Sequence, residues 1–185
     1  MFAKNILSIP TETECFKIME QYSMLPNIIE HSIQVKNSAM AIANNLIDKN
    51  SINIELVCAG ALLHDIAKTI TLKTGERFHD RIGADLIIKL GYPEVAEICA
   101  SHVLLNSFNP HGNVEEREIV HYSDKRVKHS KIVSLEERFE DLLVRYGTTE
   151  EKIATILENK RFLYLLDEKI NKHSIKNIDE ILKTE

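Results

Sequence analysis

The segment AGALLHDIAKT, residues 59–69, places an imidazole, a carboxylate and an amine at the end of an apolar stretch. His64 and Asp65 are adjacent, and adjacent residues in a helix project about 100° apart. They can nevertheless converge on one ion that lies beyond the end of the helix. Imidazole and carboxylate together suit Fe, Mn, Co, Ni or Zn. An isolated pair of this kind is more often a hydrogen-bonded core histidine beside an aspartate at a helix end.

Four further side chains of metal-binding type lie on other predicted helical segments: His31, His79, His102 and Asp124. Each lies near a helix end or in a partly apolar helical stretch. Taken singly, His79 could be a polar residue at a helix start, and His102 could be a core histidine with a hydrogen-bond partner. Together with His64 and Asp65 they favour one cluster of metal ligands.

The remaining histidines have weaker signals. His111 lies in the loop NPHGN and is expected at the surface, although it could replace or join His102 or contact a substrate. His121 stands three residues before Asp124 on the same helix face, which allows a further ligand or a partner of a ligand. His129 and His173 are expected to be solvated.

Several cations stand close in sequence to the candidate ligands: Lys68, Arg77, Arg81, Lys125, Arg126 and Lys128. Lys68 follows Asp65 by three residues, so both side chains share one helix face. A lysine here could balance charge on a phosphoryl group, or it could simply complement the helix dipole. Most of the run DKRVKHSK is expected to be a solvated face.

The composition is that of a soluble globular protein, with 44% hydrophobic and 28% charged residues in a chain of 185. The net charge of −5 argues against a general nucleic-acid binder. The three cysteines form no CxxC pair, which favours reduced thiols. No apolar run reaches membrane-spanning length, and the first residues lack a signal-peptide core. A cytoplasmic protein that binds neither membrane nor nucleic acid is expected.

Helix signals recur along the chain. Candidate N-caps are Thr11, Asn53, Ser134, Thr148 and Asn177, while Pro26 and Pro93 suit first helical turns and Gly91 a helix end. The patterns predict helices over about 11–22, 26–50, 54–68, 80–90, 93–105, 114–129, 134–146, 148–172 and from 177 onward, with loops at 69–77 and 106–113. The segment 54–68 is apolar nearly all round and is expected to be central. No strand alternation persists, so an all-α single domain is predicted.

The order and spacing of His31, His64–Asp65 and Asp124 resemble the H…HD…D signature of the HD-domain superfamily of metal-dependent phosphohydrolases. The flanking segments EHSIQVKNSAMAIA, CAGALLHDIAK and IVHYSDKRVKH are also similar to that family. The resemblance covers about residues 25–145. It implies a helical bundle of the HD-domain type over residues 1–185, with the core at about 25–145. The helices at about 148–183 would pack on this core or form a homodimer interface.

The segments RFHDRIGADLIIKLG and ICASHVLL resemble those that supply extra histidines in the two-metal branch of this superfamily. The resemblance implies that one ion takes His31, His64 and Asp124, that a second takes His79 and His102, and that Asp65 bridges them. The expected cofactor is two divalent transition ions per chain, Fe or Mn first, with Ni, Co, Zn or Mg as alternatives.

The activity that this resemblance implies is hydrolysis of a phosphate ester or phosphoanhydride by a metal-activated water, with Asp65 and Lys68 as catalytic residues. The substrate would be a small phosphorylated molecule such as a nucleotide. Two alternatives remain open at this point. A di-iron oxygenase of the same superfamily uses the same six ligands, and a non-catalytic sensor or binding module could retain the scaffold.

Overall fold

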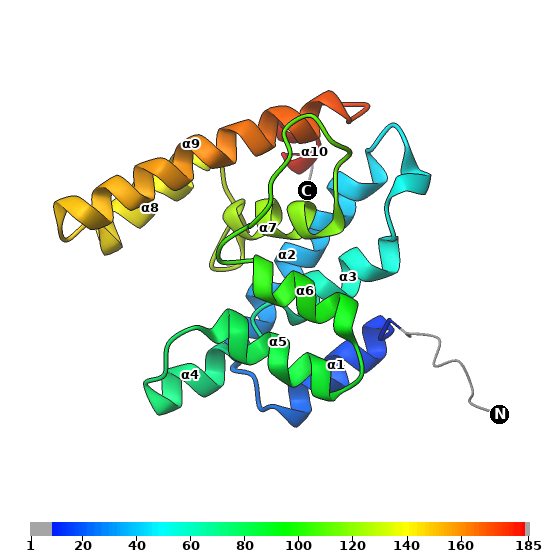
Figure 1. The fold of residues 1–185 in the computed structure, drawn as a ribbon, viewed down its shortest axis with the longest axis vertical. Coiled ribbons are helices and arrows are strands. Elements are labelled where there is room, and N and C mark those ends of the chain that lie inside the picture. The colour runs from blue at the N-terminus through cyan, green and yellow to red at the C-terminus, as the bar shows by residue number, and fades with distance from the viewer. Residues whose placement is uncertain (1–8, 184–185) are drawn as a thin grey trace.

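The computed structural model describes residues 9–183. Its helices are α1 Glu12–Gln21, α2 Pro26–Asn44, α3 Ile54–Leu63, α4 Lys68–Thr74, α5 His79–Lys89, α6 Pro93–Ser101, α7 Glu116–Lys125, α8 Leu135–Tyr146, α9 Glu150–Lys172 and α10 Ile178–Leu182, with a 3₁₀ turn at Lys49–Ser51 (Figure 1). Two short strands, β1 Val127–Lys128 and β2 Lys131–Ile132, form an antiparallel hairpin. The predicted all-α class is therefore confirmed.

Most of the predicted helix starts are confirmed by side-chain caps. The side chains that accept a hydrogen bond from a backbone N–H of the first turn are those of Thr11, Asn53, Ser134 and Asn177. Thr149, rather than the predicted Thr148, caps α9. Gly91 has a φ of 91° directly after the end of α5, a conformation that favours glycine.

Helix α3 is central, as its apolar sequence predicts. Val57 and Ala61 belong to one buried cluster, which also contains residues of α2, α7, α9 and α10. Leu62 and Leu63 belong to a second buried cluster, formed with α1, α5 and α6. A Cβ atom at Gly60 would lie 2.6 Å from Ile98 Cδ1, so the glycine permits the close approach of α3 and α6. Helix α3 therefore packs against both buried clusters, and its C-terminal end lies where they meet.

The predicted helix over 54–68 and the predicted loop over 69–77 are partly wrong. Helix α3 ends at Leu63, a turn follows, and α4 occupies Lys68–Thr74. Thr69 is buried, and its hydroxyl accepts a hydrogen bond from the backbone N–H of Leu25 at 3.0 Å. This contact with a residue 44 positions away stabilises a helix that local composition does not favour.

The expectation of a solvated face is wrong at Arg126, whose side chain is 3% exposed. Its guanidinium group donates hydrogen bonds to the Val133 carbonyl, the Tyr122 hydroxyl and Asp179. Tyr122 in turn donates to Asp167 on α9. The arginine therefore ties the end of α7 to the C-terminal helices.

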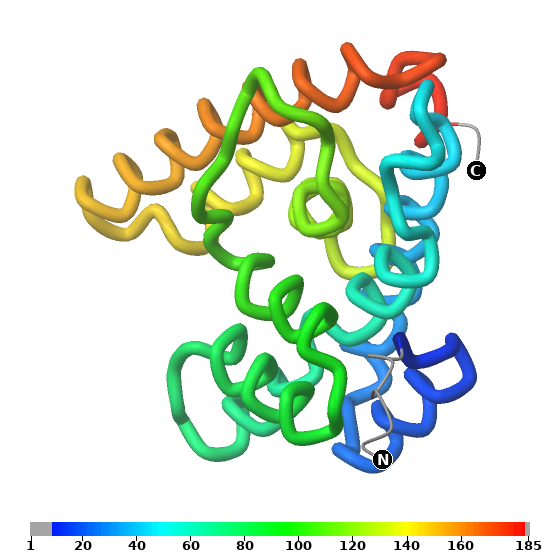
Figure 2. Tube along the Cα trace, turned by 45° about the vertical axis from the view of Figure 1, so that its right-hand side comes forward, coloured from blue at the N-terminus to red at the C-terminus, as the bar shows by residue number. Residues whose placement is uncertain are grey.

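Helices α8 and α9 run side by side and project from the remainder of the protein, as Figure 2 shows in yellow and orange. The C-terminal half of α9 buries Leu163, Leu166 and Ile170 in the core. Val144, near the end of α8 and its connection to α9, is 86% exposed. The homodimer and the division into a core and a C-terminal segment stay predictions. None of the helices within residues 9–183 combines the length and apolar character of a membrane span.

Candidate metal centre

The six predicted ligands lie together, and most stand at helix ends. His64 is the C-cap of α3, Asp65 follows it, and His102 is the C-cap of α6. His79 is the first residue of α5, Asp124 is the second-last residue of α7, and His31 lies in the second turn of α2. Helix C-termini carry partial negative charge. Three of them, from α3, α6 and α7, therefore favour cations at this place.

The first group of donor atoms joins α2, α3 and α7. His31 Nε2 lies 3.0 Å from Asp124 Oδ1, and His64 Nε2 lies 3.8 Å from the same oxygen. His64 Nε2 is also 3.5 Å from Asp65 Oδ2. Donor atoms of His31, His64 and Asp65 all lie within 4.8 Å of one another, so one ion can contact all of them.

The second group of donor atoms surrounds the other oxygen of Asp65. His79 Nε2 lies 3.3 Å from Asp65 Oδ1, and His102 Nε2 lies 3.4 Å from it. The two imidazole nitrogens are 3.1 Å apart. Asp65 therefore presents one oxygen to each group, which is the arrangement that a bridging carboxylate needs.

Three of the rings are oriented by backbone carbonyls. The Nδ1–H groups of His31, His64 and His102 donate to the carbonyls of His129, Ala61 and Cys99, at 2.7, 2.7 and 2.6 Å. This tautomer leaves the Nε2 lone pair of each ring directed toward the cluster. The His129 carbonyl belongs to the turn of the β1–β2 hairpin, where His129 has a φ of 57°.

Both carboxylates of the cluster are held ionised. Burial alone would raise the pKa of Asp65, but the neighbouring rings of His64, His102 and His79 hold that pKa well below its usual range. Burial opposes ionisation of Asp124 in the same way, and Lys125 and His31 hold its pKa well below its usual range. Burial lowers the pKa of His102, which keeps its ring neutral and able to bind a metal.

The unpartnered atoms of the cluster provide the test of whether metal ions fit. His64 Nε2 and Asp65 Oδ1 are buried and make no hydrogen bond within the described residues. Buried polar atoms without partners cost about 1–3 kcal/mol each, and a divalent cation bound at each of the two groups would remove this cost. Imidazoles and carboxylates are also ligands that divalent transition ions accept. The cluster is therefore suited to binding divalent metal ions.

A cavity of about 520 Å³ opens onto the cluster. Lys68 and Lys125 lie at its inner end: Lys68 Nζ donates to Asp65 Oδ2 at 2.7 Å, and Lys125 Nζ donates to Asp124 Oδ2. Lys68 is 41% exposed, so its ammonium group reaches both the carboxylate and the cavity. Its sequence-based placement on the same face as Asp65 agrees with this contact.

Other candidate residues lie apart from the donor atoms. His111 is exposed in the loop between α6 and α7. His121 is buried, its Nδ1–H donates to the Ser101 carbonyl at 3.2 Å, and its ring packs against Phe162. Arg77 and Arg81 are exposed and do not line the cavity of the described structure.

Several residues of the site escaped the sequence analysis. The far wall of the cavity comes from α8, through Arg138, Leu142, Arg145 and Tyr146. These residues carry no metal-binding signature and lie in a helix that the sequence did not connect with the ligands. The role of the His129 carbonyl also escaped, because a backbone contact leaves no signal in residue type.

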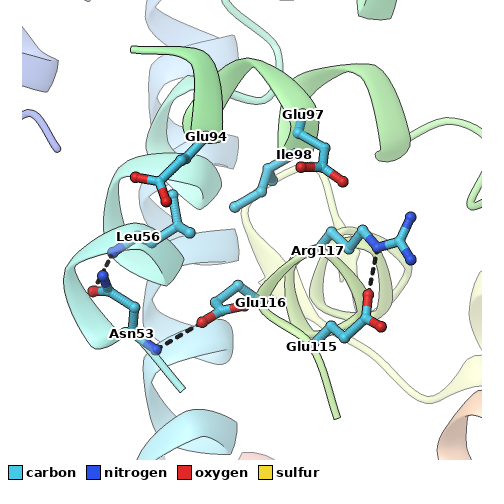
Figure 3. Close-up of a pocket in the computed structure, with 8 residues that line it drawn as sticks. All are labelled: Asn53, Leu56, Glu94, Glu97, Ile98, Glu115, Glu116 and Arg117. Carbon is cyan, nitrogen blue, oxygen red and sulfur yellow. Dashed lines mark hydrogen bonds and ion pairs between the residues drawn. The ribbon is translucent and has the colours of Figure 1, made fainter. Parts of the chain in front are cut away.

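A second pocket, of about 310 Å³, lies between α3, α6 and the start of α7 (Figure 3). Its polar lining is mainly acidic: Glu94, Glu97, Glu115 and Glu116, with Arg117 paired to Glu115. An acidic lining repels phosphorylated compounds, so the cavity at the histidine cluster is the better candidate for their chemistry.

Comparison with known proteins shows similarity over most of the chain. The family model described as HD domain matches residues 28–181. The chain is 35% identical over 101 residues to a tRNA (cytidine(56)-2′-O)-methyltransferase of Thermoplasma volcanium, covering 54% of this chain and 28% of that protein. It is 24% identical over 159 residues to the uncharacterised protein MJ0778 of Methanocaldococcus jannaschii, covering 78% of this chain and 88% of that one. No solved structure matches the chain significantly.

Proposed function

The chain belongs to the HD domain family, and on that premise we propose that it is a metal-dependent phosphohydrolase acting on a small phosphorylated molecule such as a nucleotide. The observation that carries the proposal is the position of Asp65, whose two oxygens face two separate groups of imidazole nitrogens. One carboxylate can thereby hold two ions close together, as a two-metal hydrolysis requires.

The assignment of ligands follows the distances. His31, His64 and Asp124 would hold one ion, His79 and His102 the other, and Asp65 both. When bound, such ions supply a nucleophile from water at neutral pH and stabilise charge on phosphoryl oxygens. Fe or Mn is proposed first, with Ni, Co, Zn or Mg as alternatives, because a mixed set of imidazole and carboxylate donors accepts several divalent ions.

The side chains around the ligands have separate tasks in this proposal. The Lys68 ammonium group has three N–H donors and uses one on Asp65 Oδ2. Another can donate to a phosphoryl oxygen whose charge grows as the bond to the leaving group breaks. Lys125 Nζ donates to Asp124 and to the His102 carbonyl, which holds both residues in place.

The cation content of the cavity favours hydrolysis of a phosphate compound over the oxygenase alternative, although the ligands are common to both. Its lining contains four cations, Lys68, Lys125, Arg138 and Arg145, in a chain whose net charge is −5. Local positive charge attracts anionic substrates. The methyltransferase activity named for the Thermoplasma protein is not proposed here, because the chain spans 28% of that protein.

The test is hydrolysis of a panel of phosphate esters and nucleotides by Mn²⁺- or Fe²⁺-loaded protein without oxygen, measured as loss of substrate and appearance of its hydrolysis products. Hydrolysis should disappear after chelation and return with the metal. Asp65→Asn should abolish it, whereas the matched control Asp85→Asn, on the exposed side of α5, should retain it. Metal-loaded protein that consumes oxygen with an organic substrate but hydrolyses no member of the panel would contradict the proposal.

A further inference from the structure

The cations of the cavity at the metal centre fall into two tiers. The inner tier, Lys68 and Lys125, contacts the carboxylates of Asp65 and Asp124. The outer tier, Arg138 and Arg145, comes from α8. Within the described residues, neither arginine forms an ion pair with Asp65 or Asp124. The arginines therefore lie apart from the ligand carboxylates.

The outer tier has more positive charge than its neighbours neutralise. Arg138 Nη1 lies 3.5 Å from Asp141 Oδ2, and Arg145 pairs with the same oxygen. Lys128 Nζ lies 3.8 Å from the other oxygen of Asp141. One carboxylate thus faces three cations, and Lys128 alone among them has a second acidic neighbour, Glu137, within the described structure.

Arg138 also has an unused donor. Its side chain is 14% exposed, and its Nε is buried without a hydrogen-bond partner in the described residues. A guanidinium group is weakly hydrated and presents its donors in a planar fork that matches the oxygens of phosphate. An anionic group in the cavity would balance the excess charge.

The rest of the cavity lining is partly apolar. Ile28, Val103, Val127, Leu142 and Tyr146 contribute to it. The cavity volume of about 520 Å³ lies within the range that binds small organic ligands. It exceeds what a single phosphate group occupies, so a larger substrate can extend from the ligand carboxylates toward α8.

We propose that Arg138 and Arg145 form a subsite for a second phosphate group of the substrate, so that the protein selects compounds with two or more phosphate groups over those with one. This inference rests on the proposed function for the placement of the reacting phosphate at the metal centre. The second phosphate group does not react, and the two guanidinium groups bind it by charge-assisted hydrogen bonds.

The test compares binding of inorganic phosphate and inorganic triphosphate to the metal-loaded full chain by titration calorimetry. Arg138→Gln and Arg145→Gln should each weaken triphosphate binding about tenfold or more, as expected for hydrogen bonds to charged groups. The affinity for inorganic phosphate should change less than about twofold, because this ion binds at the metal centre and makes no hydrogen bond to either arginine. Arg161→Gln, an exposed arginine on α9, is the matched control and should behave as the unsubstituted protein.

Equal weakening of both probes, or none, would overturn the subsite. Metal content and thermal unfolding midpoints verify that each variant is folded, and if Arg138→Gln fails to fold, the more exposed Arg145 decides the question. Phosphate release from esters is measured separately. If the variants lose triphosphate binding selectively but the protein hydrolyses no substrate, the subsite is supported and the proposed function is overturned. If the protein hydrolyses a substrate but the variants affect both probes equally or not at all, the proposed function is supported and the subsite is overturned.

Discussion

The Nε2 atoms of His79 and His102 lie 3.1 Å apart beside the same oxygen of Asp65. His102 donates its Nδ1–H to the Cys99 carbonyl, so its Nε2 carries a lone pair directed at His79. The residue before His79, Phe78, is the N-cap of α5 and has a left-handed φ of 67°. That conformation is uncommon for a bulky residue. Two rings from different helices are thus positioned to share one ion.

Replacing His79 with alanine should remove one ion and leave the other. The proposed ligands of the first ion, His31, His64 and Asp124, should be unaffected, because His79 contacts none of them directly within the described structure. Elemental analysis of His79→Ala should therefore show about one metal ion per chain instead of about two, as the loss of one ligand from a two-histidine site predicts. His111→Ala, in an exposed loop, is the control and should keep both. Unchanged metal content in His79→Ala would contradict the second site.

Replacing Lys68 with alanine should lower the turnover number while metal ions remain bound. Lys68 touches a ligand carboxylate without being a ligand, and it faces the cavity. Loss of one donor that stabilises developing charge typically costs about 10²–10³-fold in turnover. Steady-state kinetics on metal-loaded Lys68→Ala give the value, with the exposed Lys73→Ala on α4 as control. A change in KM alone would show that Lys68 only binds substrate.

The buried ion pair between Glu118 on α7 and Lys169 on α9 should make a large contribution when one partner is removed. Both side chains are 1% exposed, and Lys169 Nζ donates to both oxygens of Glu118 at 2.7 Å. Lys169→Met leaves a buried carboxylate without its partner and should lower the free energy of unfolding by about 3–5 kcal/mol. Urea unfolding measures this loss.

The control for that prediction is Lys172→Met, an exposed lysine one turn further along α9, which should change stability little. Adding Glu118→Gln to Lys169→Met should restore most of the loss, because glutamine can still accept from the backbone N–H of Glu115 without a charge. A double variant as unstable as Lys169→Met would mean that packing, and not the unpaired charge, sets the cost.

His121 should make stability fall in mild acid. Burial, together with the charge of Lys125, lowers the pKa of His121 to about 3. An unfolded histidine titrates near 6.5, so between these two values the unfolded state binds the proton and the folded state does not. The free energy of unfolding therefore decreases below about pH 6.5, by up to about 1.4 kcal/mol per pH unit.

The measurement compares the pH dependence of unfolding between pH 7 and pH 5 in the unsubstituted protein and in His121→Gln, under identical metal conditions. The glutamine variant should show the flatter dependence, because it has no proton to bind on unfolding. The exposed His111→Gln should match the unsubstituted protein. Parallel curves for all three would mean that His121 is protonated in the folded state.

The sequence by itself determined the class of the fold and the candidate ligands. Local rules were sufficient for the fold class. Helix caps such as Asn53 and Ser134 act within one turn, and the apolar residues on all sides of α3 belong to its own sequence. The six candidate ligands could be proposed because imidazole and carboxylate side chains carry their chemistry in their type, and their order resembles a known family.

Only the tertiary structure decided the rest. Helix α4 depends on the contact of Thr69 with Leu25, and the burial of Arg126 depends on Asp179, 53 residues away. The orientation of His31 by the His129 carbonyl and the placement of Arg138 across the cavity likewise join segments far apart in the chain. Residue type and local spacing do not encode such contacts, because they arise when the packed helices bring distant side chains together.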